Sequence, residues 1–317
     1  MNIATSLNKK YVNYTYVMMK SVLVNNENED ICFYILHSEL DDSDMKILKP
    51  LTDEYGKSIE FLKVERSKLD GKLPTTEAWS LEAYFRLMLL DLLPSDVDRL
   101  LYLDVDVIVD KSLNELYYAD FEGQLFAVCK EMPFQGSFPD IRQELFAKQF
   151  DNGYQYFNSG VMLWNIEQLR KEGYDFNKYM ELAAEINYKV LAPDQDLLNL
   201  MHYNRLLYVD EYKYDLFARY AHSFDITYED VKRETVIVHF PGYKPWSGEF
   251  VHFDIERIWW DYAKLTPMYG KMLEEFMESS LKDTETERVM KRLTEEKKSL
   301  ADECQKMAEL IKKVIGK

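Results

Sequence analysis

Short apolar segments alternate with amphipathic ones over the first part of the chain. Apolar runs at residues 2–6, 31–37 and 59–64 have the length and the β-branched content of strands. Between them, apolar residues recur at helical spacing after Tyr14, and a polar helix is expected from about Asp42. This order predicts an α/β fold with a mostly parallel central sheet flanked by helices.

The apolar run at residues 99–109 has two acidic residues near its middle. Such a run is typical of a strand buried on both faces, where carboxylates need a cation or a position at the open end of the strand. We therefore expect the strand to stop near Leu103. Asp104 and Asp106, with Val105 between them, would then converge on one divalent cation, and their hard oxygen ligands suit Mg²⁺ or Mn²⁺. A strand followed by an Asp-rich turn is the alternative.

Residues 79–93 are apolar almost all round and are followed by Pro94, which predicts a buried helix that ends there. Arg86 is the exception in this segment. A buried guanidinium needs an anionic partner, so Arg86 is either one half of a structural ion pair or a ligand for substrate.

Polar side chains also stand beside later elements. Strands are expected at residues 125–131 and 160–164, and Asn158 lies at the loop-to-strand junction before the second. Its amide either satisfies a turn or hydrogen-bonds a sugar hydroxyl. A helix start is expected near Pro193, and capping explains only one of the two acids in the segment Asp194-Gln195-Asp196.

The last expected strand, residues 235–240, contains His239. A histidine near the end of a strand is more often a hydrogen-bonded structural residue than a ligand. However, the pair of acids described above needs a third ligand to complete a metal site. A turn at Gly242 follows, with Lys244 two residues further on, and such a turn suits the binding of phosphate.

Residues 283–317 have a different pattern, with eight residues at the a and d positions of four heptads. These are Met290, Leu293, Lys297, Leu300, Cys304, Met307, Ile311 and Val314. We predict a long amphipathic helix here, separate from a domain of residues 1–282. The helix could pack on its own domain, form a coiled coil in a homodimer, or lie on a membrane surface.

Composition narrows the function classes. The net charge of −17 argues against a nucleic-acid partner, because phosphate groups would be repelled. The three cysteines lie far apart without metal-ligand spacing, which favours reduced thiols in a cytoplasmic protein. We expect neither a signal peptide nor a membrane span, since no run reaches roughly eighteen successive apolar residues.

Five segments, taken together and in order, resemble motifs of the retaining glycosyltransferases of family 8. They are AYFRL at 83–87, LYLDVD at 101–106, YFNSGV at 156–161, DQD at 194–196 and HFPGYKPW at 239–246. The family includes bacterial lipopolysaccharide galactosyl- and glucosyltransferases and glycogenin. The resemblance implies a GT-A type, Rossmann-like α/β fold with a UDP-sugar donor, glucose or galactose most of all, and a glycan, lipopolysaccharide or other hydroxyl acceptor.

The resemblance also implies roles for single residues. The ligands of Mn²⁺, or of Mg²⁺ in its place, are Asp104, Asp106 and His239. The residues lining the donor sugar are Arg86, Asn158, Asp194 and Gln195. The residues beside the nucleotide and diphosphate are Asn8, Tyr11, Val105, Gly242 and Lys244, with Tyr11 at the position that stacks on uracil. The segment Asn8-Lys9-Lys10 departs from the acidic residues common there.

The expected chemistry is sugar transfer with retention of configuration. A divalent cation stabilises the charge that develops on departing UDP. Retention needs a nucleophile on the far face of the sugar or a front-face route. Because the amide of Gln195 is a poor nucleophile, we favour the front-face route, with Gln195 and Asp194 stabilising an oxocarbenium-like sugar.

Two other functions compete with this interpretation. In a haloacid dehalogenase-type phosphatase, Asp104 would be the nucleophile and Asp106 the acid/base, but that motif usually lies near the start of the chain. In a non-catalytic coiled-coil scaffold, the sugar site would be vestigial. The presence of both acids and His239 argues against this second alternative.

Overall fold

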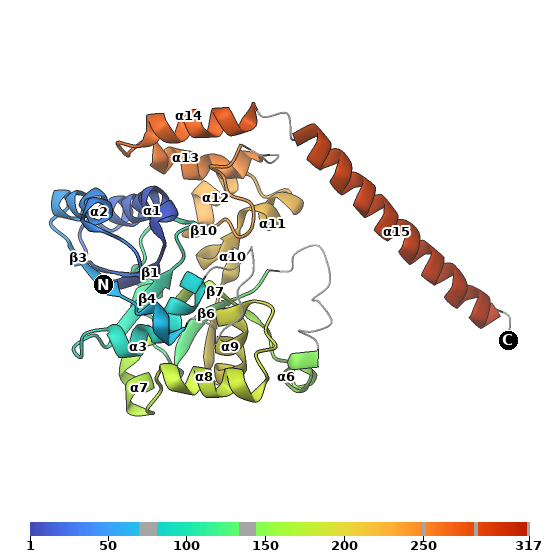
Figure 1. Cartoon of the computed structure of the whole chain (residues 1–317), viewed down its shortest axis with the longest axis horizontal. Helices are drawn as coiled ribbons and strands as arrows, with labels where there is room; N and C mark the ends of the chain where they lie inside the picture. The colour runs from blue at the N-terminus through green and yellow to red at the C-terminus, as the bar shows by residue number, and fades with distance from the viewer. Residues whose placement is uncertain (70–80, 133–143, 249–251, 282–284, 316–317) are drawn as a thin grey trace. The chain divides into compact units, whose positions relative to one another are not determined.

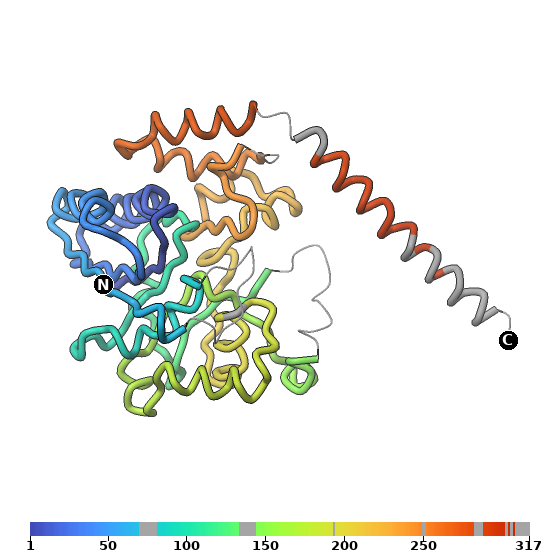
Figure 2. The backbone as a smooth tube through the Cα atoms, in the orientation of Figure 1, coloured from blue at the N-terminus to red at the C-terminus, as the bar shows by residue number. Residues whose placement is uncertain are grey.

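Figure 2 traces the backbone of the computed structural model, which describes residues 1–69, 81–132, 144–248, 252–281 and 285–315. The chain divides into two compact units. The first comprises residues 1–242 and 253–267, and the second comprises residues 243–252 and 268–317. Every candidate site residue except Lys244 therefore lies in the first unit.

A seven-stranded sheet with the order β3-β2-β1-β4-β7-β6-β8 forms the centre of the first unit. Its strands are β1 (Asn2–Ser6), β2 (Cys32–His37), β3 (Ser58–Lys63), β4 (Arg99–Leu103), β6 (Phe126–Lys130), β7 (Phe157–Asn165) and β8 (Leu206–Val209). Strands β1 to β4 pair in parallel, and β6 pairs in parallel with β8. Only β7 runs antiparallel to both neighbours. The expected mostly parallel sheet is confirmed, with this one strand reversed.

Strand β7 also begins earlier than the expected 160–164. The side chain of Asn199 accepts a hydrogen bond from the backbone nitrogen of Phe157 at 2.9 Å and donates to its carbonyl oxygen at 3.0 Å. These bonds hold Phe157 in extended backbone, and it pairs with Lys130 of β6. Asn158 is therefore the second residue of β7, close to the loop-to-strand junction where the sequence placed it, and the strand itself starts earlier than expected.

The helix expected at residues 79–93 is mostly a 3-10 helix, η3 (Leu81–Met88), followed by the short α3 (Leu89–Leu92). Residues 79 and 80 lie outside the described residues. Apolar residues on all sides of this segment correctly predicted its burial. They could not distinguish a 3-10 helix, with three residues per turn, from an α-helix with 3.6. The end was predicted correctly, since Leu93 is extended before Pro94.

A second sheet with the order β5-β10-β9 lies beside the first. Its strands are β5 (Val107–Val109), β9 (Leu216–Phe217) and β10 (Ile237–His239). Strand β10 is shorter than the expected 235–240, and it pairs antiparallel with β5 so that His239 lies opposite Val107. This register brings His239 next to the turn that carries the two acids.

Helices cover both faces of the central sheet. Figure 1 shows α1 (Val12–Asn25) and α2 (Asp42–Glu54) together on one side, and α7 (Ile166–Lys171), α8 (Phe176–Glu185) and α9 (Pro193–His202) on the other. On the second side, η3, α8 and α9 bury a core with the sheet residues Tyr102, Phe126, Met162 and Trp164. This packing fixes Arg86 of η3 and the first turn of α9 against the ends of β4 and β7.

Short helices complete the first unit. They are η1 (Lys9–Tyr11), η2 (Arg66–Lys68), α4 (Asn114–Tyr117), α6 (Ala147–Asp151), α10 (Glu211–Tyr214), α11 (Ala218–Ser223), α12 (Tyr228–Glu234), η4 (Asp254–Glu256) and α13 (Arg257–Ala263).

The second unit contains α14 (Tyr269–Ser280) and α15 (Glu285–Ile315). Within it, the backbone nitrogen of Gly248 donates to the hydroxyl of Ser279 at 2.9 Å. Helix α15 lies in the expected C-terminal tail, and its Leu300 is 62% exposed. The domain boundary between residues 282 and 283 stays a prediction. No helix in the described ranges is long and apolar enough to cross a membrane.

Candidate active site

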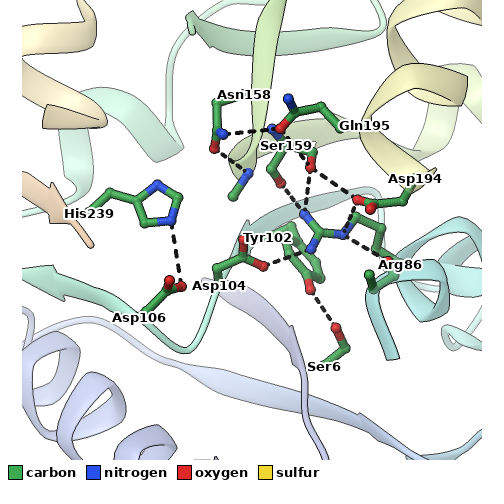
Figure 3. A network of polar contacts seen from close by, with 12 residues as sticks. Ser6, Arg86, Tyr102, Asp104, Asp106, Asn158, Ser159, Asp194, Gln195 and His239 are labelled. Carbon is green, nitrogen blue, oxygen red and sulfur yellow. Dashed lines mark hydrogen bonds and ion pairs between the residues drawn. The ribbon is translucent and has the colours of Figure 1, made fainter. Parts of the chain in front are cut away.

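The site lies at the carboxyl end of β4, where the chain turns away from the central sheet. Leu103 is the last residue of β4, as expected, and it pairs with Val161 of β7. The next backbone nitrogen, that of Asp104, donates to the carbonyl oxygen of Gly160 at 2.8 Å. The turn through Asp106 then leads directly into β5, so both acids point away from the apolar interior of the strand (Figure 3).

Asp104, Asp106 and His239 come together as the sequence predicts. One ligand atom from each lies within 4.8 Å of the others. The Nε2 atom of His239 is 3.5 Å from Oδ1 of Asp106. Two carboxylate oxygens and one imidazole nitrogen on converging side chains fit a divalent cation such as Mn²⁺. Val105 lies between the two acids in the turn and is half-buried.

Asp215, which the sequence did not single out, orients His239. Its Oδ1 atom is 2.8 Å from Nδ1 of His239, and its side chain is fully buried. Burial lowers the pKa of His239, but Asp215 and Asp106 outweigh that effect and raise it to about 10. A carboxylate behind a ligating histidine fixes the ring and its tautomer. No motif in the sequence marks Asp215. It comes close to His239 because it directly precedes β9, which pairs in parallel with β10.

Gly160 makes room for this cluster. A Cβ atom at this position would lie 2.8 Å from Oδ2 of Asp104 and 2.9 Å from Oδ1 of Asn158, and closer still to the ring of His239. Real Cβ atoms essentially never make such contacts. Close approach of these three side chains therefore requires a glycine at this position.

Arg86 connects the metal-ligand candidates to α9. Its Nη2 donates to Oδ1 of Asp104 at 2.8 Å, and its Nε lies 2.9 Å from Oδ2 of Asp194. Its Nη1 donates to the carbonyl oxygen of Ser159 and to the Ser159 hydroxyl, and the guanidinium lies over the ring of Tyr102 at 4.3 Å. Burial disfavours the charge of Arg86, but the two carboxylates outweigh it and raise the pKa of the guanidinium. The ion-pair alternative for Arg86 is thus present in the structure.

Gln195 sits in a hydrogen-bonded frame. Its Oε1 accepts from Nδ2 of Asn158 at 3.0 Å and from the backbone nitrogen of Ser159 at 2.9 Å. Its Nε2 donates to Oε1 of Glu131 at 3.0 Å. The Asn158 carbonyl oxygen accepts from the backbone nitrogen of Gly160 at 2.8 Å. The sequence did not assign a role to Glu131 or Ser159: Glu131 ends an expected strand, and Ser159 lies in the YFNSGV segment beside Asn158, which was the residue considered there.

The two acids of the α9 segment have different roles. Asp196 serves the local backbone, since its Oδ2 accepts from the backbone nitrogens of Leu191 at 2.6 Å and Ala192 at 2.9 Å. Asp194 instead pairs with Arg86, and burial raises its pKa while Arg86 opposes that shift. Capping therefore accounts for one acid, as the sequence suggested.

The residues expected beside the nucleotide lie in several places. Asn8 caps η1 by accepting from the backbone nitrogen of Lys10 at 3.0 Å, and the half-buried ring of Tyr11 meets that of Tyr14 at 5.9 Å. Gly242 has a φ of +79°, which favours glycine. Lys244 belongs to the second unit, so its role at the diphosphate stays a prediction.

Comparisons with known proteins identify a family and several relatives of this chain. The family Glycosyl transferase family 8 matches residues 2–249. A lipopolysaccharide 1,2-glucosyltransferase of Escherichia coli is 29% identical over 255 residues, which cover 77% of this chain and 73% of that protein. A lipopolysaccharide 1,3-galactosyltransferase of Salmonella typhimurium is 28% identical over 253 residues, which cover 78% and 73%.

Solved structures share the fold. The galactosyltransferase LgtC, in complex with donor and acceptor sugar analogs, aligns with a TM-score of 0.69 and 23% identity. An active-site mutant of LgtC aligns with a TM-score of 0.72 and 23% identity. Each alignment covers 84% of this chain and 96% of the other. The GT-A type α/β fold is therefore confirmed.

Proposed function

This chain belongs to glycosyl transferase family 8 and is a hexosyltransferase, and we propose that it moves glucose or galactose from a UDP-sugar to a hydroxyl acceptor with retention of configuration. The observation that carries the proposal is the continuous polar network from the Asp104, Asp106 and His239 cluster through Arg86 to Asp194 and Gln195. It joins a cation site to a sugar site, as transfer from a nucleotide sugar requires.

At the cation site, Asp104, Asp106 and His239 would hold Mn²⁺, whose positive charge stabilises departing UDP. Arg86 binds one oxygen of Asp104, and Gly160 of β7, which carries no side chain, leaves room beside the other. Asp215 holds the ring of His239 with Nε2 toward Asp106. These contacts preorganise the three ligands, so that little reorganisation accompanies binding of the nucleotide.

At the sugar site, the surroundings of the candidate nucleophiles favour the front-face route. Gln195 carries an amide, and Asp194 is 2% exposed with an oxygen engaged by Arg86. A double displacement would need one of these groups to form a bond to the anomeric carbon. In the front-face route, that carbon loses its bond to UDP as it bonds to the acceptor oxygen, and the hydroxyl proton leaves with the UDP oxygen.

The alternatives from the sequence receive less support. The family match from residue 2 to residue 249 does not fit a haloacid dehalogenase-type phosphatase. The convergence of Asp104, Asp106 and His239 on one point argues against a vestigial sugar site. The names of the relatives favour a lipopolysaccharide or similar glycan as acceptor in bacterial cell-surface polysaccharide synthesis. We propose a cytoplasmic enzyme that meets such an acceptor at the inner face of the membrane.

A panel of UDP-sugars tests this function. UDP release is measured with Mn²⁺, first with water and then with hydroxyl acceptors of the lipopolysaccharide core. We expect release from UDP-glucose or UDP-galactose that acceptors accelerate. Absence of release from every UDP-sugar, together with release from another nucleotide sugar, would overturn the donor assignment.

A further inference from the structure

A cavity of about 670 Å³ opens in the first unit next to the sugar site. Its described lining includes five aromatic side chains: Phe150, Tyr154, Tyr156, Tyr212 and Tyr220. They come from the segment around α6 and from helices α10 and α11, which lie far apart in the sequence. The ring of Tyr212 is 46% exposed and lies 6.5 Å from that of Tyr220, so aromatic surface remains accessible there.

Two contacts connect this cavity with the polar network of the site. Glu131 lines the cavity and accepts a hydrogen bond from Gln195 at 3.0 Å. Tyr156 also lines the cavity, and its hydroxyl donates to Asp196, in the same turn of α9 as Gln195, at 2.5 Å. A molecule in the cavity would therefore lie beside the residue placed at the donor sugar.

The lining has the side chains typical of a carbohydrate site, and its net charge is negative. Flat aromatic rings offer apolar area to the C–H faces of a sugar, and carboxylates accept hydrogen bonds from its hydroxyls. The charged residues of the lining are Lys130 against Glu131, Asp151 and Glu211, which is one cation against three anions. Such a balance disfavours phosphate groups because like charges repel.

We propose that this aromatic cavity binds an uncharged sugar residue of the acceptor glycan and thereby selects acceptors without phosphate at that position. The proposal adds an acceptor site to the proposed glycosyltransferase function. It rests on that function, because a bound glycan is an acceptor only if the chain transfers a sugar to it. The binding itself does not need the donor, so the two ideas can fail separately.

The test is ligand-observed saturation-transfer NMR on the whole chain without UDP-sugar. The probes are lactose, maltose and cellobiose, each compared with its monophosphate. We expect at least one uncharged disaccharide to bind more tightly than its phosphorylated form. Tyr212→Ala and Tyr220→Ala should each weaken that binding by about threefold to tenfold, the scale of one lost aromatic contact.

Tyr118→Ala is the matched control, because Tyr118 is 59% exposed and does not line the cavity. It should leave the Kd unchanged. Asp151→Lys should raise the affinity for the monophosphates by removing one anion and adding a cation. Binding that Tyr212→Ala and Tyr220→Ala leave unchanged, tighter binding of the monophosphates by the unaltered chain, or no binding of any disaccharide would each overturn the proposal. UDP release from UDP-sugar in water, measured in parallel, reports separately on the proposed function.

Discussion

Gly160→Ala is a small change that should disable the site without disturbing the backbone. Gly160 has no positive φ, so alanine can adopt its backbone conformation. The added methyl group would meet the ring of His239, Oδ2 of Asp104 at 2.8 Å and Oδ1 of Asn158 at 2.9 Å. Two candidate metal ligands and one candidate sugar contact must then move together.

The expected magnitudes differ between stability and activity. Overpacking of this kind costs about 1–3 kcal/mol of unfolding free energy. A displacement of reacting groups by about 1 Å can lower the rate about a hundredfold, or roughly 2.7 kcal/mol. We therefore expect a folded protein whose rate of UDP release falls by about two orders of magnitude.

The assay combines UDP release with Mn²⁺ and urea denaturation of the same preparation. Gly270→Ala is the matched control, because a Cβ there meets nothing within 4 Å and the residue lies in α14. It should keep full activity and equal or greater stability, since alanine favours helix. Gly160→Ala with unchanged UDP release would refute the close packing of these three side chains around Gly160.

Three further predictions concern the nucleotide, acid stability and stereochemistry. Tyr11→Ala should weaken UDP binding by about 1–2 kcal/mol in calorimetry with little change in stability, and unchanged affinity would count against stacking. Burial and the charge of Arg205 lower the pKa of His202 in the folded chain to about 3. Because the pKa of an unfolded histidine is about 6.5, the unfolded chain binds more protons than the folded chain below that pH. The free energy of unfolding should therefore fall by up to about 2 kcal/mol from pH 7 to pH 5. In urea titrations, His202→Gln should reduce this loss of unfolding free energy, whereas the control His222→Gln, at an exposed histidine, should not. An equal loss in His202→Gln and in the unaltered chain would contradict the role of His202. Proton NMR of the first product from an α-linked UDP-sugar should show the α-anomer, whereas a β-anomer would contradict retention.

Local sequence signals predicted the parts of the fold whose causes are local. The end of β4 at Leu103 followed from two carboxylates that could not stay in a buried strand. The position of Pro94 predicted the end of α3. The apolar pattern around Arg86 predicted burial but not the 3-10 geometry, because burial depends on which side chains are apolar and not on the helical pitch.

The parts that the sequence did not predict depend on contacts between distant segments. Asp215 acts through the parallel pairing of β9 with β10, which no spacing in the sequence reports. Glu131 reaches Gln195 only because β6, which Glu131 follows, and α9 both pack against β7. The start of β7 was predicted too late because the bonds from Asn199, which extend the strand to Phe157, come from a helix about forty residues later.

We propose that Asp104, Asp106 and His239 hold a divalent cation that UDP departure needs. The most direct measurement is UDP release from UDP-glucose and UDP-galactose in EDTA and after addition of excess Mn²⁺, for the unaltered chain and for Asp106→Asn. We expect no release in EDTA, recovery with Mn²⁺ in the unaltered chain, and at least about a hundredfold lower kcat in Asp106→Asn, or roughly 2.7 kcal/mol. Full release in EDTA, or full activity of Asp106→Asn, would contradict this role of the cation.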